Sequence, residues 1–231
     1  MTVTGEQLRV TPFLDHDSAQ VRDFVDRWAP EDGTDAMTRA VALYRAVRDR
    51  ITYEVFGADL SRDGLRASEV VTRRSGICLH KSVLYAATLR AIGVPSRLLL
   101  TDVRNHLSSP RLRELVGGDV FTFHCLTVVH NGQEWVRATP VFNRTLCRLY
   151  GITPLDFDGK NDSVHHPYDL KGRRHMEFLR THGEFDDLPY DLVLSGLRAA
   201  HPALFATPTR FATGSLVADA GRITATEGDV A

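Results

Sequence analysis

The most informative segment of this chain is Arg74-Ser75-Gly76-Ile77-Cys78-Leu79-His80-Lys81-Ser82. A glycine precedes the cysteine, and a run with helical periodicity follows it from Ser82 to Leu89. A cysteine at a helix N-terminus meets unpaired backbone N–H groups and the positive end of the helix dipole, and both favour the nucleophilic thiolate. The segment therefore offers Cys78 as a candidate nucleophile. The alternative is a buried cysteine that packs as a small hydrophobic residue.

A second informative segment lies about 45 residues downstream, at Phe121–Pro140. β-Branched and aromatic residues flank Asn131-Gly132, a dipeptide typical of two-residue β-hairpin turns. If these two residues form a type I′ turn, His124 on the first strand faces Thr139 on the second. Opposed residues share a face of the sheet, so the hairpin predicts that these two side chains are neighbours.

Taken together, these segments resemble the transglutaminase-like superfamily, papain-like cysteine enzymes with a Cys-His-Asp triad. The resemblance covers roughly residues 37–143. It rests on Ile51-Thr52-Tyr53, the Gly-x-Cys opening of a helix, Ala91-Ile92-Gly93-Val94-Pro95, a strand at Ser96–Leu100, and a His-led hairpin carrying Trp135 and Pro140. It implies an α+β fold in which the Cys-bearing helix packs on an antiparallel sheet. It also implies that Cys78 is the nucleophile and His124 the general base.

The chain departs from the family pattern at the third member of the triad. The family places Asp four residues after the hairpin tryptophan, where this chain has Thr139. A threonine hydroxyl accepts a hydrogen bond from an imidazole but supplies no charge. Three alternatives remain: Thr139 orients His124, a carboxylate such as Asp158 or Asp162 folds back over the site, or the site is degenerate and only binds.

The resemblance implies acyl transfer or amide hydrolysis through a thioester on Cys78, without a cofactor. His124 would take the thiol proton, and the backbone N–H of Cys78 with a second donor would hold the oxyanion. We expect a small-molecule or peptide acyl substrate, possibly from bacterial natural-product metabolism. The alternative function is a non-catalytic binding module on the same fold, which the missing Asp favours.

Several other residues are candidates for supporting roles. Arg137 and Trp135 share a face with Thr139, so Arg137 could clamp a substrate carboxylate or lie over the tryptophan. His80 and Lys81 could tune the thiolate or face water. His165-His166 and His175 could reach the site through the segment after the hairpin, but we favour solvated loop residues at these positions. A zinc set of Cys78, His80, His124 and Cys125 is disfavoured because helical and strand geometry points these side chains apart, and Cys125 is expected in the core.

Composition and charge set limits on the function. The 231 residues are 43% hydrophobic and 25% charged, as expected for a globular chain with one sizeable core. A net charge of −1 gives no general attraction for nucleic acid or an anionic membrane, and no stretch approaches a membrane span. Residues 1–11 lack the features of a signal peptide, and three cysteines without framework spacing suit a reducing cytoplasm. The sequence gives no indication of the oligomeric state.

Periodicity and turn residues predict the remaining elements. We expect helices at Ser18–Trp28, Ala36–Arg48, Ala67–Thr72, from Asp169 to His182, and from Asp187-Leu188-Pro189 to Ala200. The polar segment Ser108–Gly118 is expected to be a loop beside the site. We expect residues 1–205 to form a single domain with helical additions at both ends, and residues 206–231 to form a flexible tail.

Overall fold

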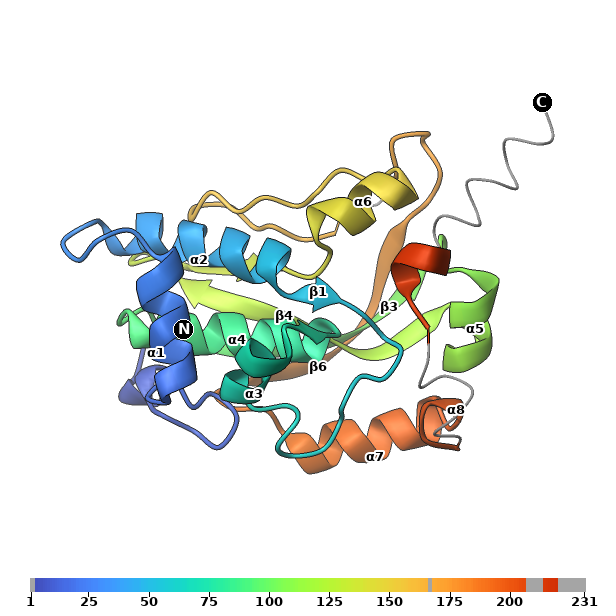
Figure 1. Ribbon diagram of the computed structural model, residues 1–231, viewed down its shortest axis with the longest axis horizontal. Coiled ribbons are helices and arrows are strands. Elements are labelled where there is room, and N and C mark those ends of the chain that lie inside the picture. Colours follow the sequence, from blue (N-terminus) through green and yellow to red (C-terminus); the bar gives the residue numbers. More distant parts are fainter. Residues whose placement is uncertain (1–2, 166–167, 207–213, 220–231) are drawn as a thin grey trace.

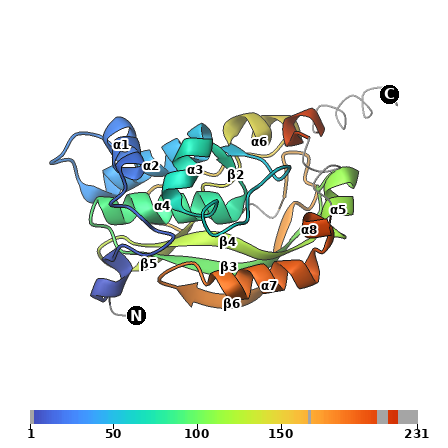
Figure 2. The same cartoon turned by 60° about the horizontal axis from the view of Figure 1, so that its bottom comes forward.

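The centre of the molecule is an antiparallel sheet with one helix lying across it. The computed structural model describes residues 3–165, 168–206 and 214–219. Within these ranges, four strands pair in the order β5-β4-β3-β6, and α4 crosses one face of their sheet (Figures 1 and 2). A separate parallel pair, β1-β2, leads the chain into α4. The expected α+β fold, with the Cys-bearing helix on an antiparallel sheet, is confirmed.

The elements follow one another along the chain with these bounds. They are the 3-10 helix Gly5–Leu8, α1 Ala19–Trp28, α2 Ala36–Arg50, β1 Thr52–Tyr53, α3 Ala67–Arg73, β2 Ser75–Gly76, α4 Cys78–Ala91, β3 Ser96–Asn105, α5 Pro110–Val116, β4 Val120–His130, β5 Trp135–Ala138, α6 Arg144–Tyr150, β6 Met176–Phe185, α7 Tyr190–Ala200 and α8 Ala203–Ala206.

Helix α4 is buried all round, from Cys78 to Arg90. One side packs on β4, while α1, α2 and α3 cover the side away from the sheet (Figure 2). A helix enclosed in this way is held mainly by packing of its apolar residues. This main core fixes both the direction of α4 and the end of the sheet that its first residue reaches.

A smaller apolar cluster surrounds the N-terminal end of α4. We call it the Cys78 cluster, and its buried members are Tyr53, Phe56, Cys78, Leu112, Leu115, Val116, Val141, Leu146 and Leu216. These residues come from β1, α5, α6, the connections beside them and the segment 214–219. The cluster is distinct from the main core. Helix α4 therefore has its first residue, Cys78, in the Cys78 cluster and its later apolar residues in the main core.

The helices expected at the N-terminus and after the last strand are confirmed. Ser18 caps α1 by accepting the N–H of Val21, and Asp35 caps α2 by accepting the N–H of Thr38 at 3.0 Å. Helix α2 extends two residues beyond the expected end, α3 one residue, and α7 ends at Ala200 as predicted.

Two segments differ from the expectation. The loop expected at Ser108–Gly118 contains α5, capped by Ser109, opened by Pro110 and closed by Gly117 in the left-handed region at φ 83°. The helix expected from Asp169 to His182 is instead the edge strand β6, which pairs antiparallel with β3. Asp169 accepts backbone N–H groups from a local turn, so it does not cap a helix. Pairing along the free edge of β3 outweighs the weak helical pattern.

The predicted hairpin is present, but the strand register predicted for it is wrong by two residues. His130 pairs with Trp135, and the side chain of Asn131 accepts backbone N–H groups of the loop. The connection therefore spans 131–134 rather than a two-residue turn. The ladder ends where Ala138 pairs with Thr127, so Thr139 does not face His124.

The predicted tail lies largely outside the described residues. The described piece, 214–219, packs against the Cys78 cluster, and Leu216 is only 2% exposed. Its backbone N–H donates to the carboxylate of Glu54 at 3.0 Å, and Asp219 pairs with Arg111 at 3.5 Å.

Candidate active site

Cys78 is the first residue of α4, and the residues around it fix the start of the helix. A Cβ atom on Gly76 would lie 2.5 Å from the Cβ of His80, so a side chain at Gly76 would collide. His80 accepts the N–H of Ile77 on Nδ1 at 3.2 Å, which leaves Nε2–H to donate to the carbonyl of Asp59 at 2.9 Å. Burial lowers the pKa of His80 to about 4. His80 is therefore a neutral cap, not a solvent-exposed or substrate-facing residue.

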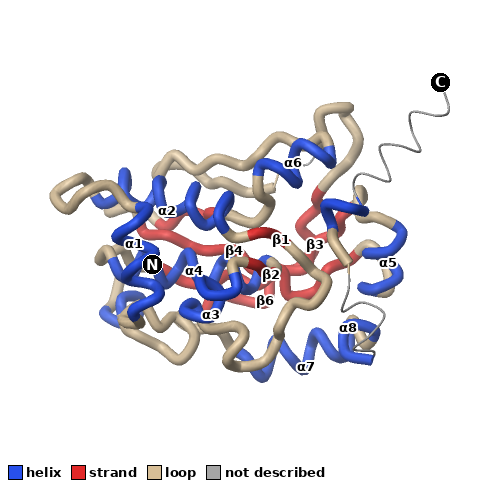
Figure 3. Tube along the Cα trace, viewed as in Figure 1, coloured by secondary structure: helices blue, strands red, loops and turns tan. Residues whose placement is uncertain are grey.

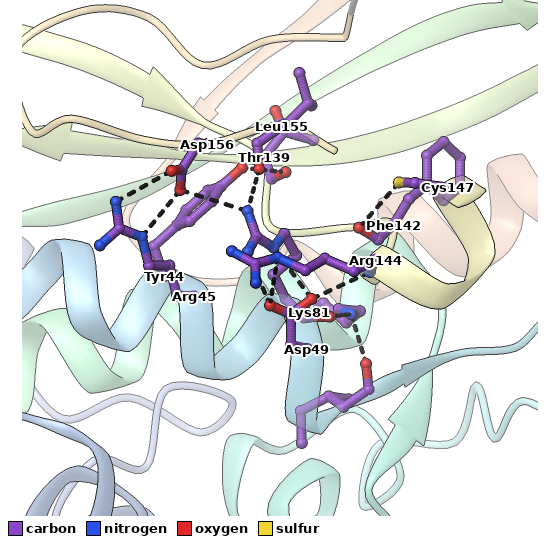
Figure 4. Close-up of polar contacts among 12 residues, drawn as sticks. Tyr44, Arg45, Asp49, Lys81, Thr139, Phe142, Arg144, Cys147, Leu155 and Asp156 are labelled. Carbon is purple, nitrogen blue, oxygen red and sulfur yellow. Dashed lines mark hydrogen bonds and ion pairs between the residues drawn. The ribbon is translucent and has the colours of Figure 1, made fainter. Parts of the chain in front are cut away.

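Lys81 ties the first turn of α4 to the end of α2 (Figure 4). It is fully buried, and its Nζ donates to the carbonyls of Arg48 and Ile51 at 2.9 and 2.6 Å. Burial lowers the pKa of Lys81 to about 7, and the coulombic attraction of Asp49 acts in the opposite direction. Lys81 is thus a structural residue that holds two helices together.

His124 follows a residue with an unusual backbone conformation. Phe123 has φ 57°, a left-handed value that costs energy for a bulky residue. Its N–H donates to Asp102 Oδ1 at 3.1 Å, and His182 Nε2 lies 2.7 Å from the same oxygen. The Phe123 ring stacks on His182 with centroids 4.2 Å apart, and a Cβ on Gly196 would overlap that ring. These contacts hold the strained residue and with it the position of His124.

Cys78 and His124 border the same cavity, which encloses about 940 Å³ including space open to solvent. The cavity wall includes six members of the Cys78 cluster, together with Leu197 of α7 and Leu204 of α8. The fold therefore brings the two residues predicted as nucleophile and base to one concave surface. Cys125 is fully buried in the main core, as expected, and its carbonyl accepts the hydroxyl of Ser82 at 2.9 Å.

Burial determines the protonation of the pair. It raises the pKa of the Cys78 thiol to about 11, against opposing backbone N–H groups of Cys125, Leu79 and Cys78 itself. It also lowers the pKa of His124 to about 4. The helix N-terminus favours the thiolate, as expected from the sequence, but the loss of hydration acts in the opposite direction and is the larger effect. The resting state is a neutral thiol with a neutral imidazole.

The second ring nitrogen of His124 is engaged by another histidine. His165 Nε2 lies 3.1 Å from His124 Nε2, and the His165 ring is packed against Phe142 with centroids 5.2 Å apart. His165 is only 5% exposed. One of the two Nε2 atoms carries the proton, and His124 keeps Nδ1 available as a base when its own Nε2–H donates to His165. His165 is therefore the residue that contacts Nε2 of the His124 ring.

Thr139 does not make this contact. Its side chain is fully buried, and its Oγ1 has no hydrogen-bond partner among the described residues. Its carbonyl accepts the hydroxyl of Tyr44 at 3.0 Å (Figure 4). Ser163 Oγ lies 3.2 Å from the same Tyr44 oxygen. The Thr139 backbone thus helps to hold the segment that carries His165, while its hydroxyl is left unused.

The two alternative carboxylates are also engaged elsewhere. Asp158 is exposed and accepts backbone N–H groups from Lys160 and Asn161 at 2.8 Å. Asp162 accepts the backbone N–H and the guanidinium of Arg137. Arg137 is therefore paired within the protein, and the carboxylate expected at His124 is an imidazole instead.

The connection from 151 to 165 is anchored at several points before it delivers His165 (Figure 3). Arg48 donates to the carbonyl of Leu155 at 2.5 Å, and Arg45 pairs with Asp156 at 3.1 Å (Figure 4). Ser163 then forms a parallel bridge with Ala138 at the end of β5. These long-range contacts fix the path of a segment that contains no helix or strand.

The remaining candidates are Trp135, His175 and His166, and the structure describes the first two. Trp135 packs with Leu126 and Val128 beneath the guanidinium of Arg97 at 4.7 Å, and it does not border the cavity. His175, expected in a solvated loop, is buried and borders the cavity. His166 lies outside the described residues. The signal for His165 and His175 was present in the chain, as histidines in a turn-rich segment, but it did not reveal their burial.

Among the described residues, no group of three or more His, Cys, Asp or Glu side chains is arranged to hold a metal ion. Within the same residues, no helix has the length and hydropathy needed to cross a membrane.

The chain is similar to a family of known proteins and to a solved structure. A crystal structure described as a "putative cysteine protease" from Cytophaga hutchinsonii aligns with a TM-score of 0.43 at 16% sequence identity. The alignment covers 60% of this chain and 43% of that protein, so the chain spans less than half the length of that protein. No curated protein sequence matches the chain. The transglutaminase-like superfamily, however, matches residues 22–140. Because this match spans more than half of the chain and includes both Cys78 and His124, the protein belongs to the transglutaminase-like superfamily.

Proposed function

We propose that the protein is a cysteine-dependent acyl-transfer enzyme that acts on a small-molecule or peptide acyl donor. The observation that carries the proposal is the arrangement at His124. This residue borders the same cavity as Cys78 and has its Nε2 engaged by His165. The arrangement leaves Nδ1 of His124 as the nitrogen that can accept a proton.

The proposed reaction has two steps, acylation of Cys78 and transfer of the acyl group to water or an amine. Cys78 attacks the carbonyl carbon of R–CO–X, the new C–S bond forms, and the C–X bond breaks. His124 takes the thiol proton and returns it to the leaving group, which departs as HX. Water or an amine then attacks the thioester, and the thiol is regenerated with release of an acid or an amide.

The neutral resting pair determines when the proton moves. With the thiol pKa near 11 and the imidazole pKa near 4, little thiolate is present before the substrate binds. Proton transfer to His124 therefore accompanies attack on the carbonyl. The His165 imidazole then accepts the Nε2–H of the imidazolium, and the backbone N–H of Cys78 is the first oxyanion donor in this scheme.

Two observations favour a second function, binding without chemistry. The thiol pKa is high, and among the described residues the side chain that contacts His124 Nε2 is an imidazole rather than a carboxylate; both weaken the nucleophile. A binding module would keep the cavity and its affinity for ligand while forming no covalent adduct.

Intact-mass analysis after acid quenching distinguishes the two functions. We expect p-nitrophenyl butyrate to add one butyryl group to the wild type and to Cys147→Ser, which serves as a matched thiol control. We expect no adduct on Cys78→Ala or on His124→Ala within the same time. An adduct that persists in Cys78→Ala, or none on any form, would reject the enzyme and favour the binding module.

A further inference from the structure

We infer that the cavity beside Cys78 binds an uncharged, medium-chain apolar acyl group, such as an aliphatic chain of about eight carbons. The chemistry of transfer rests on the proposed function, but the binding of the chain does not. The cavity would hold the acyl half of the donor, and the leaving group would lie outside it.

The first support is the composition of the wall. Six members of the Cys78 cluster, Cys78 among them, line the cavity. The wall includes Tyr53, Leu112, Val116, Leu146, Leu204 and Leu216. Cavities with such linings stay dry and take apolar ligands.

The second support is that two polar side chains of the wall, those of His201 and Ser108, already have hydrogen-bond partners within the protein. His201 donates from Nδ1 to the carbonyl of Val116 at 2.7 Å and accepts the N–H of Thr122 on Nε2 at 3.1 Å. The hydroxyl of Ser108 donates to a backbone carbonyl at 2.9 Å and accepts from Arg113 at 3.2 Å. A polar acyl chain would lose its hydration here and find these partners occupied.

The third support is the placement of charge. None of the described residues that line the cavity is Asp, Glu, Lys or Arg. Charged residues near the cavity are paired or stacked outside its wall: Glu54 accepts the N–H of Leu216, and Arg111 lies over the ring of Phe56 at 4.4 Å. A chain with a terminal carboxylate would therefore be buried without a counterion.

The extent of the cavity fits the same class. Besides Cys78, its lining includes apolar residues of α5, α6 and α8, so an acetyl group on the thiol would leave much of that lining without contact. Each added methylene that enters an apolar site strengthens binding by about fourfold, so a longer chain gains affinity until the space is filled.

Calorimetry on Cys78→Ala protein tests the binding directly, without any dependence on catalysis. The ligands are butanamide, octanamide and suberamic acid, which is an eight-carbon amide with a terminal carboxylate. Four extra methylenes predict that octanamide binds about 200-fold more tightly than butanamide. Suberamic acid should lose most of this gain. Equal binding of the two amides, or suberamic acid binding as well as octanamide, would overturn the inference.

Acylation of the wild type separates this inference from the proposed function. Single-turnover release of p-nitrophenolate should be much faster from the octanoate ester than from the butyrate ester, with both adducts on Cys78. Tight octanamide binding without any adduct would support the cavity assignment and reject the chemistry. Adducts that form at equal rates for both chains would support the chemistry and overturn the assignment.

Two variants test whether the acyl chain of the substrate lies in this cavity. Leu204→Trp adds bulk to a half-buried wall residue and should reduce the ratio of octanoyl to butyryl transfer at least tenfold. Leu192→Trp adds the same bulk at a position 47% exposed and outside the wall, and should leave the ratio unchanged. Thermal melts confirm that both fold. If the two folded variants keep the same ratio as the wild type, the chain does not occupy this space.

Discussion

Replacement of His165 by phenylalanine tests the role of the histidine pair most directly. His165→Phe keeps a ring of similar size against Phe142 but removes the nitrogen that lies 3.1 Å from His124 Nε2. A hydrogen bond to a charged group contributes about 1.5–3 kcal/mol, and His124 is charged only after it takes the thiol proton. The loss therefore predicts a fall of roughly 10- to 150-fold in the acylation rate. This is less than the ~10⁴-fold loss typical of a triad carboxylate, because His165 supplies no charge.

The assay is single-turnover acylation of Cys78 by an activated ester, followed across pH. His165→Asn should restore most of the rate, because an amide oxygen can accept the Nε2–H of His124. In His165→Phe, loss of the acceptor should lower the pKa of His124 further, and the acidic limb of the pH–rate profile should move to lower pH. A purely structural role would not move that limb.

Thr139→Val is the matched control for this experiment. Thr139 Oγ1 has no hydrogen-bond partner among the described residues, so the valine should leave the acylation rate nearly unchanged and should not reduce stability. If Thr139→Val slowed acylation while His165→Phe stayed within twofold of the wild type, the assignment of His165 would be wrong.

Three further predictions concern reactivity and stability. Brief iodoacetamide treatment near neutral pH should label Cys78 before the other two buried thiols, because only Cys78 borders the cavity; peptide mapping that finds equal labelling would contradict this. Gly196→Ala would push into the ring of Phe123, so denaturant unfolding should show a loss of about 1–3 kcal/mol, and an unchanged midpoint would count against the tight contact. Burial lowers the pKa of His80 and of His124 to about 4, whereas both would titrate near 6.5 when unfolded. The unfolded state therefore binds protons first as pH falls from 6.5 to 4, so stability should drop by on the order of 3 kcal/mol per histidine and level off below pH 4; thermal melts that stay flat over this range would refute the argument.

The sequence predicted the parts of the site that depend on local signals. The start of α4 follows from Gly76 and Cys78, and the placement of His124 on a strand follows from the alternation of residues before Asn131. The turn was harder, because the Asn131 side chain accepts two backbone N–H groups and stabilises a four-residue connection. A two-residue turn and a four-residue loop use the same Asn-Gly signal, so the register could not be read from it.

The parts that failed depend on contacts between distant segments. Strand β6 forms because β3 offers it a free edge, which no local pattern around residues 176–185 reveals. His165 reaches His124 because Arg48, more than 100 residues earlier, holds the carbonyl of Leu155. A prediction from local periodicity places such a residue in a solvated loop, since the anchors become visible only in three dimensions.

The two-cluster organisation has a consequence for how this protein can be altered. Cys78 and His124 are positioned by the main core of α4 and the sheet, whereas most of the cavity wall is built from short helices and connections outside that core. Changes in α5, α6 or α8 can therefore reshape the space beside the thiol without repacking the helix and strands that align the reacting groups. In the enzyme proposed above, substrate preference would therefore depend mainly on these short elements, while the alignment of Cys78 with His124 would depend on the core.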